Sequence, residues 1–301
     1  MPAKLTYSLV MFLAGSCYGI VVPLVRAAYG AGFSTVEVMA TQYLLAALLL
    51  SSIVALFSRR RIKLLDVVKL LGVGAVAAGV SFSYFQALSL LPSATALTLL
   101  FQFVWMGMLV QALRERHLPR LGAFGAMLLV MVGALGATGV VEEGFSPASL
   151  PPAGLFFGML SALFYTAFLV LSSKVATTLP AVNRTMITAV GSLLLTFLLD
   201  PGALLATGLS AQSMLVSSLP LSLALGLIGI CLPVFLIALS APKLPSGLTT
   251  VMASSELPSG VLCAVLFCGD PLPLSVGMGI IIVIGGIVLS EWESLRAAAR
   301  Q

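Results

Sequence analysis

Long runs of apolar residues, separated by short polar stretches, form the main pattern along this chain of 301 residues. A run of roughly 20 apolar residues is long enough to cross a lipid bilayer as an α-helix. The pattern predicts ten such helices, at about 5–27, 36–57, 70–90, 94–113, 121–141, 153–173, 184–199, 214–240, 246–268 and 272–290. The seventh is short, and the eighth is interrupted by Pro220 and Pro233. The expected fold class is therefore an all-α polytopic membrane protein.

The pattern of the first half recurs in the second half. The Ala-Leu-Ser triplet of 87–89 recurs at 238–240, the pair Pro92-Ser93 recurs as Pro245-Ser246, and Gly125 and Gly133 recur as Gly277 and Gly285. The offsets are 151, 153 and 152 residues, respectively. If each copy holds five crossings, the second is upside down relative to the first, which is typical of secondary transporters. We predict two inverted five-helix repeats, at 1–141 and 153–301.

The composition agrees with a chain that lies almost entirely in the bilayer. Apolar residues make up 60% of it and charged residues only 8%, and the mean hydropathy is +1.15. A soluble domain carries about 25% charged residues. No gap between the apolar runs is long enough for a catalytic or nucleotide-binding domain. These features exclude a soluble enzyme.

The basic residues lie in alternate connections between the predicted spans. Lys and Arg concentrate on the cytoplasmic side of membrane proteins, so they orient the chain. With the N-terminus inside, fourteen of the fifteen basic residues are cytoplasmic, namely Lys4, Arg59, Arg60, Arg61, Lys63, Lys69, Arg114, Arg116, Arg120, Lys174, Arg184, Lys243, Arg296 and Arg300. Arg26 falls outside, together with Glu37, Glu142, Glu143, Asp200 and Asp270. We predict cytoplasmic N- and C-termini, and we interpret the net charge of +5 as membrane orientation rather than a nucleic-acid-binding surface.

Candidate chemistry is sparse. The sequence has no GxxxxGK[ST], HExxH or GxSxG motif. Cys17, Cys231, Cys263 and Cys268 lie in apolar runs without CxxC spacing, which favours buried hydrophobic roles over a metal site or disulfides. The single histidine, His117, lies in a basic loop. We expect no enzymatic activity, no metal site and no cofactor.

Polar and aromatic side chains are concentrated in some of the spans. Thr95, Thr98, Gln102 and Trp105 follow one another at i, i+3, i+7 and i+10, which forms one stripe on a helix. Polar groups in membrane helices usually face the bundle interior or water. We predict a central, almost uncharged substrate cavity lined by Tyr18, Tyr84, Thr98, Gln102, Trp105, Tyr165 and Ser255. The competing interpretation of each residue is structural, since Ser and Thr often bond their own backbone and Tyr and Trp occupy membrane interfaces.

The fifth and tenth spans contain almost no polar residues and are rich in Gly and Ala. Such helices pack closely or face lipid, and they are also candidates for a dimer contact. We therefore expect a monomer or a weak homodimer. Gly15-x-x-x-Gly19 and Gly154-x-x-x-Gly158 are expected to mark close contacts between helices.

Glu256 is the carboxylate that falls well inside a predicted span. A charged group there is costly unless it is paired or neutralised. One interpretation is that Glu256 exchanges a proton during transport. The other is structural: Glu256 stays protonated or holds backbone and serine partners near Pro258, where a helix hydrogen bond is lost.

The sequence resembles the drug/metabolite transporter superfamily of the EamA type, and in particular its bacterial aromatic amino acid exporters. The resemblance covers essentially the whole chain and is carried by Pro245-Ser246-Gly247, Glu256-Leu257-Pro258, Phe267-Cys268-Gly269-Asp270 and the pair Gly277 and Gly285. Asp270 stands where the family usually has Glu. In the first half, Arg114-Glu115-Arg116 resembles the equivalent turn, but the preceding Gly is replaced. The resemblance implies a substrate site between two repeats, lined by the first, third, fourth, sixth, eighth and ninth spans, and an acid near Pro258 that serves packing.

These observations lead to an expected function. We expect a carrier in the bacterial cytoplasmic membrane that exports aromatic and other neutral amino acids, such as Phe, Trp, Tyr, Met and Thr, by alternating access as a facilitator. Aromatic walls suit the side chain of such a substrate, and Ser, Thr and Gln can bond its ammonium and carboxylate groups. The alternatives are a proton-coupled exporter of a nucleoside, sugar, polyamine or drug, and a channel or membrane scaffold.

Overall fold

Helices account for all the regular secondary structure in the part of the chain that this computed structural model describes, residues 2–57, 62–91, 93–117, 121–139, 150–199 and 219–299. Within these residues, nine helical segments are long and apolar enough to cross a membrane, and Leu121–Ala137 is a shorter apolar helix. In a bilayer core only a helix satisfies its backbone groups within its own segment, so apolar runs of this length fold as helices. The helical membrane class is thus confirmed.

The helices follow the predicted order of the apolar runs. The first half contains α1 (Pro2–Gly30), α2 (Thr35–Phe57), α3 (Leu64–Leu90), α4 (Ser93–Leu100), α5 (Phe103–Glu115) and α6 (Leu121–Ala137). The second half contains α8 (Pro152–Ser172), α9 (Ala181–Leu199), α11 (Leu219–Gly226), α12 (Leu232–Ser240), α13 (Ser246–Ala253), α14 (Glu256–Cys263) and α15 (Leu274–Ala299). Arg59, Arg60, Arg61, Arg120, Glu142, Glu143, Asp200 and Arg300, used above to orient the chain, lie outside the described residues.

Two predicted spans are broken in the middle, which the sequence analysis did not anticipate. The fourth divides into α4 and α5 at Phe101 and Gln102, and the ninth divides into α13 and α14 at Ser254 and Ser255. Pro258 explains the second break, because its ring clashes with the carbonyl four residues earlier, that of Ser254. The two breaks are 153 residues apart.

The eighth span is continuous but locally widened. A π-helical turn at Leu227–Cys231 joins α11 to α12, directly before Pro233, and a 3₁₀ turn at Ala241–Lys243 follows α12. A π-turn is one way for a helix to accommodate a proline without ending. The predicted interruption at Pro233 is therefore a bulge, while Pro220 stands at the second residue of α11.

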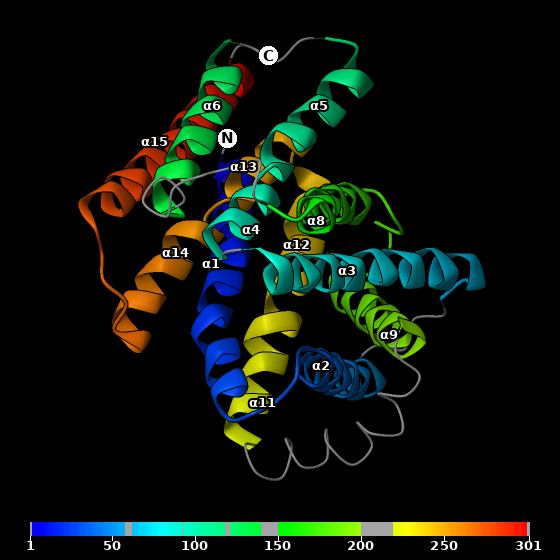
Figure 1. The fold of residues 1–301 in the computed structure, drawn as a ribbon. Helices are drawn as coiled ribbons and strands as arrows, with labels where there is room; N and C mark the ends of the chain where they lie inside the picture. Colours follow the sequence, from blue (N-terminus) through cyan, green and yellow to red (C-terminus); the bar gives the residue numbers. More distant parts are fainter. Residues whose placement is uncertain are drawn as a thin grey trace.

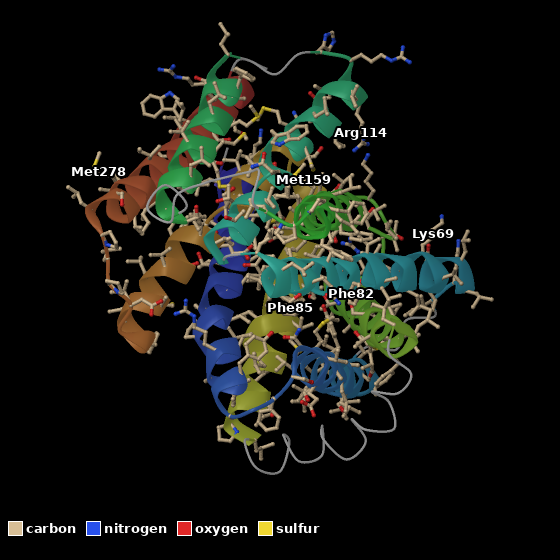
Figure 2. The ribbon with its side chains drawn as sticks, in the orientation of Figure 1. Lys69, Phe82, Phe85, Arg114, Met159 and Met278 are labelled. Carbon is tan, nitrogen blue, oxygen red and sulfur yellow. The ribbon has the colours of Figure 1, made fainter. Side chains whose placement is uncertain are left out.

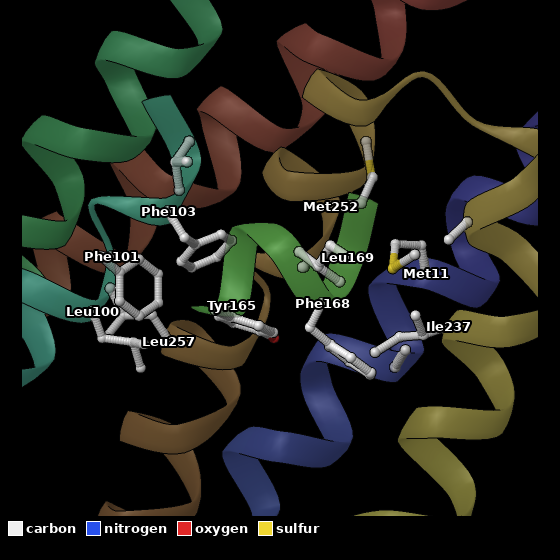
Figure 3. Packing of buried hydrophobic residues seen from close by; sticks show 14 of the residues in the cluster. Met11, Leu100, Phe101, Phe103, Tyr165, Phe168, Leu169, Ile237, Met252 and Leu257 are labelled. Atoms are coloured by element: carbon white, nitrogen blue, oxygen red, sulfur yellow. The ribbon is translucent and has the colours of Figure 1, made fainter. Parts of the chain in front are cut away.

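The two halves pack mainly against each other. α3 contacts α8 and α9, α1 contacts α12 and α14, and α6 lies along α15 (Figure 1). A large apolar core joins elements of both halves, with Phe101, Phe103, Tyr165 and Leu257 close together in Figure 3. Charged side chains such as Lys69 and Arg114 extend from the ends of α3 and α5, away from this core (Figure 2). The halves thus form one interleaved bundle.

Glycines set the closest approach between α6 and α15. A Cβ atom on Gly133 would lie 2.7 Å from Val283 N and 2.8 Å from Gly279 O. A Cβ atom on Gly279 would in turn collide with backbone atoms of Ala137, Gly133 and Gly136. The small residues of the fifth and tenth spans therefore bring these two helices of the same chain together, as small residues do in membranes.

Arg184 joins the ends of three helices. Its guanidinium donates to Ala238 O at 2.7 Å and to Ser172 O, so α9 is tied to the last turns of α12 and α8. Only 3% of the residue is exposed. Ala238 O lacks its helical donor because residue 242 is proline, and the C-terminal ends of α8 and α12 carry partial negative charge. Arg184, which the sequence analysis counted among the basic residues on the cytoplasmic side, is thus a buried helix residue with a structural function.

Candidate functional site

A carboxyl group and a tyrosine, both from the second half of the chain, meet beside α5 of the first half. Glu256, in the first turn of α14, accepts a 3.1 Å hydrogen bond from the Tyr165 hydroxyl on α8. The Tyr165 ring is buried, and its centroid lies 4.5 Å from that of Phe103, the first residue of α5. Tyr165 therefore contacts the first residue after each helix break.

Two further tyrosines complete this group. The ring of Tyr18 on α1 meets that of Tyr165 edge-on, with centroids 6.3 Å apart. Tyr18 on α1 and Tyr84 on α3 both pack against the apolar core that contains Tyr165, and their hydroxyl groups lie in the neighbourhood of the Glu256 carboxyl. We call Tyr18, Tyr84, Tyr165 and Glu256 the central cluster. The sequence analysis placed the three tyrosines in a predicted cavity and treated Glu256 separately, as a coupling or structural acid. The fold brings all four together from four helices.

Two glycines place α1 beside this cluster. A Cβ atom on Gly15 would clash with Ser255 and with Ala253 O, and one on Gly19 would lie 2.5 Å from both Glu256 O and Gly260 N. The predicted close contact of Gly15-x-x-x-Gly19 is confirmed, and its partner is the break between α13 and α14. Ser255, a predicted site residue, uses its hydroxyl to donate to Phe12 O of α1 at 2.6 Å. The same contact holds Tyr18 near Glu256.

The side chains of Gln102 and Trp105 form hydrogen bonds at the other helix break, the one at Phe101 and Gln102. The Gln102 backbone N–H bonds Leu99 O, three residues earlier, so Thr98 O loses the donor that a continuous helix would supply. The Gln102 side-chain amide replaces that donor at 3.1 Å, and Gln102 Oε1 accepts from Trp105 Nε1 at 2.9 Å. The polar atoms that the sequence analysis assigned to substrate thus hold the local backbone, although both side chains remain partly exposed.

Thr98 belongs to a different surface. Its hydroxyl bonds that of Thr138 at 2.9 Å, just after α6. A mostly apolar cavity of about 220 Å³ lies beside it, lined by Thr98, Phe101, Gln102, Leu128, Met131, Val132, Ala134 and Leu135. The predicted stripe of the fourth span is therefore split by the helix break, and Thr98 faces α6.

The sequence analysis missed Phe103 and assigned other partners to Glu256. Nothing in the sequence marks Phe103, because one phenylalanine in an apolar run is ordinary. For Glu256, the structural interpretation expected serine or backbone partners near Pro258, but the carboxyl group bonds Tyr165 of another helix. Ser259 instead bonds backbone oxygens of its own helix.

Truncation of Trp105 tests whether its ring contacts substrate. Trp105→Ala is expected to weaken apparent substrate affinity about five- to tenfold, since a good aromatic contact contributes on the order of 1 kcal/mol. Trp105→Phe keeps most of the ring, loses the bond to Gln102 and should weaken affinity less. The measurement is the half-saturating substrate concentration in liposomes, with exposed Trp292→Ala as the control. Normal affinity in Trp105→Ala would show that the ring only packs.

Comparison with known proteins supports the fold but gives no information about the function. No family model matches the chain, and no curated protein matches it. Among solved structures, the chain is similar to one titled only "Crystal structure of protein", with 17% identity and a TM-score of 0.74. The match covers 97% of this chain and 98% of that one. At this level of identity the similarity shows that an experimentally determined protein shares the whole fold.

Proposed function

We propose that this protein is a carrier of the EamA type in the drug/metabolite transporter superfamily. It exports aromatic and other neutral amino acids across the bacterial cytoplasmic membrane by alternating access. The observation that carries the proposal is the central cluster. A carboxyl group and three tyrosines from four helices lie at the level of two helix breaks, in a bundle of apolar helices. Polar groups of this kind inside a membrane bundle mark substrate or ion pathways.

A repeated contact supports the inverted-repeat architecture. A Cβ atom on Gly74 of α3 would meet three atoms of α9, and one on Gly226 of α11 would meet the equivalent positions of α2. The α9 positions are Thr188, Gly191 and Ser192, and the α2 positions are Gln42, Leu45 and Ala46. Each α9 position follows its counterpart by 146 residues, and Gly226 follows Gly74 by 152. Two copies of one helix arrangement would produce such a match.

Broken helices also suit transport. In many carriers the substrate site lies near the membrane midplane, where interrupted helices expose backbone groups to the substrate. Here the breaks at 101–102 and 254–255 both lie against the central cluster through Phe103 and Glu256. Each break divides its span into two short helices, so the helices beside the site have natural bending points.

Purified protein in liposomes tests the proposal directly. We expect saturable flux of Phe, Trp, Met or Thr, which empty liposomes and liposomes with an unrelated membrane protein do not show. Saturation separates a carrier from a channel. Absence of flux for all four amino acids would contradict the amino acid assignment, and flux that rises linearly with concentration would indicate a pore.

A second candidate function, proton-coupled export, is favoured by the carboxyl group of Glu256 inside the bundle. The titratable groups that face it are Tyr18 on α1, Tyr84 on α3 and Tyr165 on α8. For a facilitator we expect flux to follow the substrate gradient alone and to ignore an imposed pH gradient. A proton-coupled carrier would respond to that gradient, and Glu256→Gln would abolish the response. Measuring flux through the wild-type protein and through Glu256→Gln, each with and without the pH gradient, separates a facilitator from a proton-coupled exporter.

A further inference from the structure

Glu256 has no basic partner in the described part of the chain. The ion pairs found there join Arg26 to Asp270 and Arg296 to Glu293, so neither involves Glu256. The polar group that bonds the Glu256 carboxyl is the Tyr165 hydroxyl, which contacts Oε2. A carboxylate inside a membrane bundle is costly unless a positive charge compensates it. Protonation of Glu256 would remove this cost, and a positively charged ligand would remove it while leaving the carboxylate ionised.

The surroundings of Glu256 suit a particular kind of positive charge. Tyr18, Tyr84 and Tyr165 supply aromatic rings from three helices, and Phe103 adds a fourth ring against Tyr165. Aromatic rings attract organic cations, and a carboxylate forms charge-assisted hydrogen bonds with an ammonium group. Sugars and nucleosides carry no positive charge, so neutral hydrogen-bonding groups would serve them as well.

We propose that Glu256, with the rings of Tyr18 and Tyr84, recognises the protonated amino group of the substrate. This inference rests on the proposed transport function and narrows it to amine-bearing molecules. The ammonium group binds the carboxylate, while Tyr165 holds Oε2 and fixes the orientation of the carboxyl group. We therefore expect the site to require the amino group of the substrate and not the carboxylate group of the substrate.

Three ligands with the same ring test this requirement. Phenylalanine carries both groups, phenethylamine carries only the amine, and 3-phenylpropionate carries only the carboxylate. Binding to purified wild-type protein in detergent or nanodiscs is measured calorimetrically, independently of transport. We expect phenylalanine and phenethylamine to bind at least about tenfold more tightly than 3-phenylpropionate, as a desolvated cation contact implies.

A substitution at Glu256 tests whether this residue is the one that binds the amino group. Glu256→Gln should weaken phenethylamine binding about tenfold or more and leave 3-phenylpropionate unchanged. Glu115→Gln, which changes an exposed carboxylate at the end of α5, is the matched control and should change neither. If Glu256→Gln does not fold, the three-ligand series on wild-type protein still decides whether binding requires the amino group.

The outcomes distinguish this inference from the proposed function. Equal binding of 3-phenylpropionate and phenethylamine to wild-type protein, or no binding of any of the three, would overturn amine recognition. Phenylalanine flux in liposomes combined with such a result would leave the carrier assignment intact. Tight, Glu256-dependent amine binding without flux of any amino acid would instead support amine recognition and contradict amino acid export.

Discussion

Replacing Arg184 by leucine is expected to destabilise the protein by about 3–5 kcal/mol. The substitution removes two charge-assisted hydrogen bonds, to Ala238 O and Ser172 O, each of which contributes about 1.5–3 kcal/mol. It also leaves two buried carbonyl oxygens without a donor, and one of them has no helical alternative because of Pro242. The measurement is thermal or denaturant unfolding of the purified protein in detergent.

Two further variants make the Arg184 result specific. Arg184→Lys should recover only part of the lost stability, since an ammonium group does not span two separated acceptors as a guanidinium does. Arg296→Leu removes an exposed arginine from the end of α15 and should change stability little. Equal stability of Arg184→Leu and Arg296→Leu would show that the three helix ends are held by other contacts.

Gly279→Ala is expected to destabilise the protein by about 1–3 kcal/mol, because its added methyl group would overpack a tight interface. The group would meet backbone atoms of α6, including Gly133 O at 2.7 Å, and backbone atoms cannot rotate away as a side chain can. The whole of α15 would have to shift relative to α6. The same unfolding measurement reports the effect.

Gly277→Ala is the matched control on the same helix. Its Cβ atom would meet nothing within 4 Å, so the substitution should be neutral or slightly stabilising through helix propensity. The sequence repeat singled out Gly125, Gly133, Gly277 and Gly285. Of these four, Gly133 faces the neighbouring helix, where it meets Gly279, while a Cβ atom on the other three would meet nothing within 4 Å. If Gly277→Ala and Gly279→Ala have the same effect, the close approach of α6 and α15 is not a stabilising contact.

The helices were predictable because the period of the apolar residues is a local property. A bilayer requires long apolar runs, and each run between Leu5 and Leu289 can be read without knowing its neighbours. The break at Ser254 and Ser255 was also accessible, since Pro258 removes a helix hydrogen bond. The break at Phe101 and Gln102 was not, because no proline lies near it. It depends on a side-chain amide that replaces a backbone donor.

The sequence indicated several residues of the candidate site, but it did not indicate the contacts between them. Tyr18, Tyr84 and Tyr165 were expected to line one cavity and Glu256 was considered separately, and the helix packing brings these four together. The Glu256–Tyr165 bond depends on how α14 and α8 meet, which a single sequence does not encode in any local pattern. Their role in binding substrate stays a prediction. Gln102 and Trp105 show the opposite case, where polar residues in a suitable stripe satisfy each other.

The position of Arg184 has a consequence for how the chain is assembled in the cell. Ala238, one of its two acceptors, is synthesised 54 residues later, which at about 5–20 residues per second means a delay of about 3–11 s. During that interval α8 and α9 have emerged, but α12 has not. Until then the guanidinium lacks one of its two acceptors, so the first turn of α9, where Arg184 lies, should remain near the headgroups until α12 arrives. We therefore expect α8, α9 and α12 to reach their final positions together, once α12 has been synthesised, with α9 remaining incompletely inserted until then.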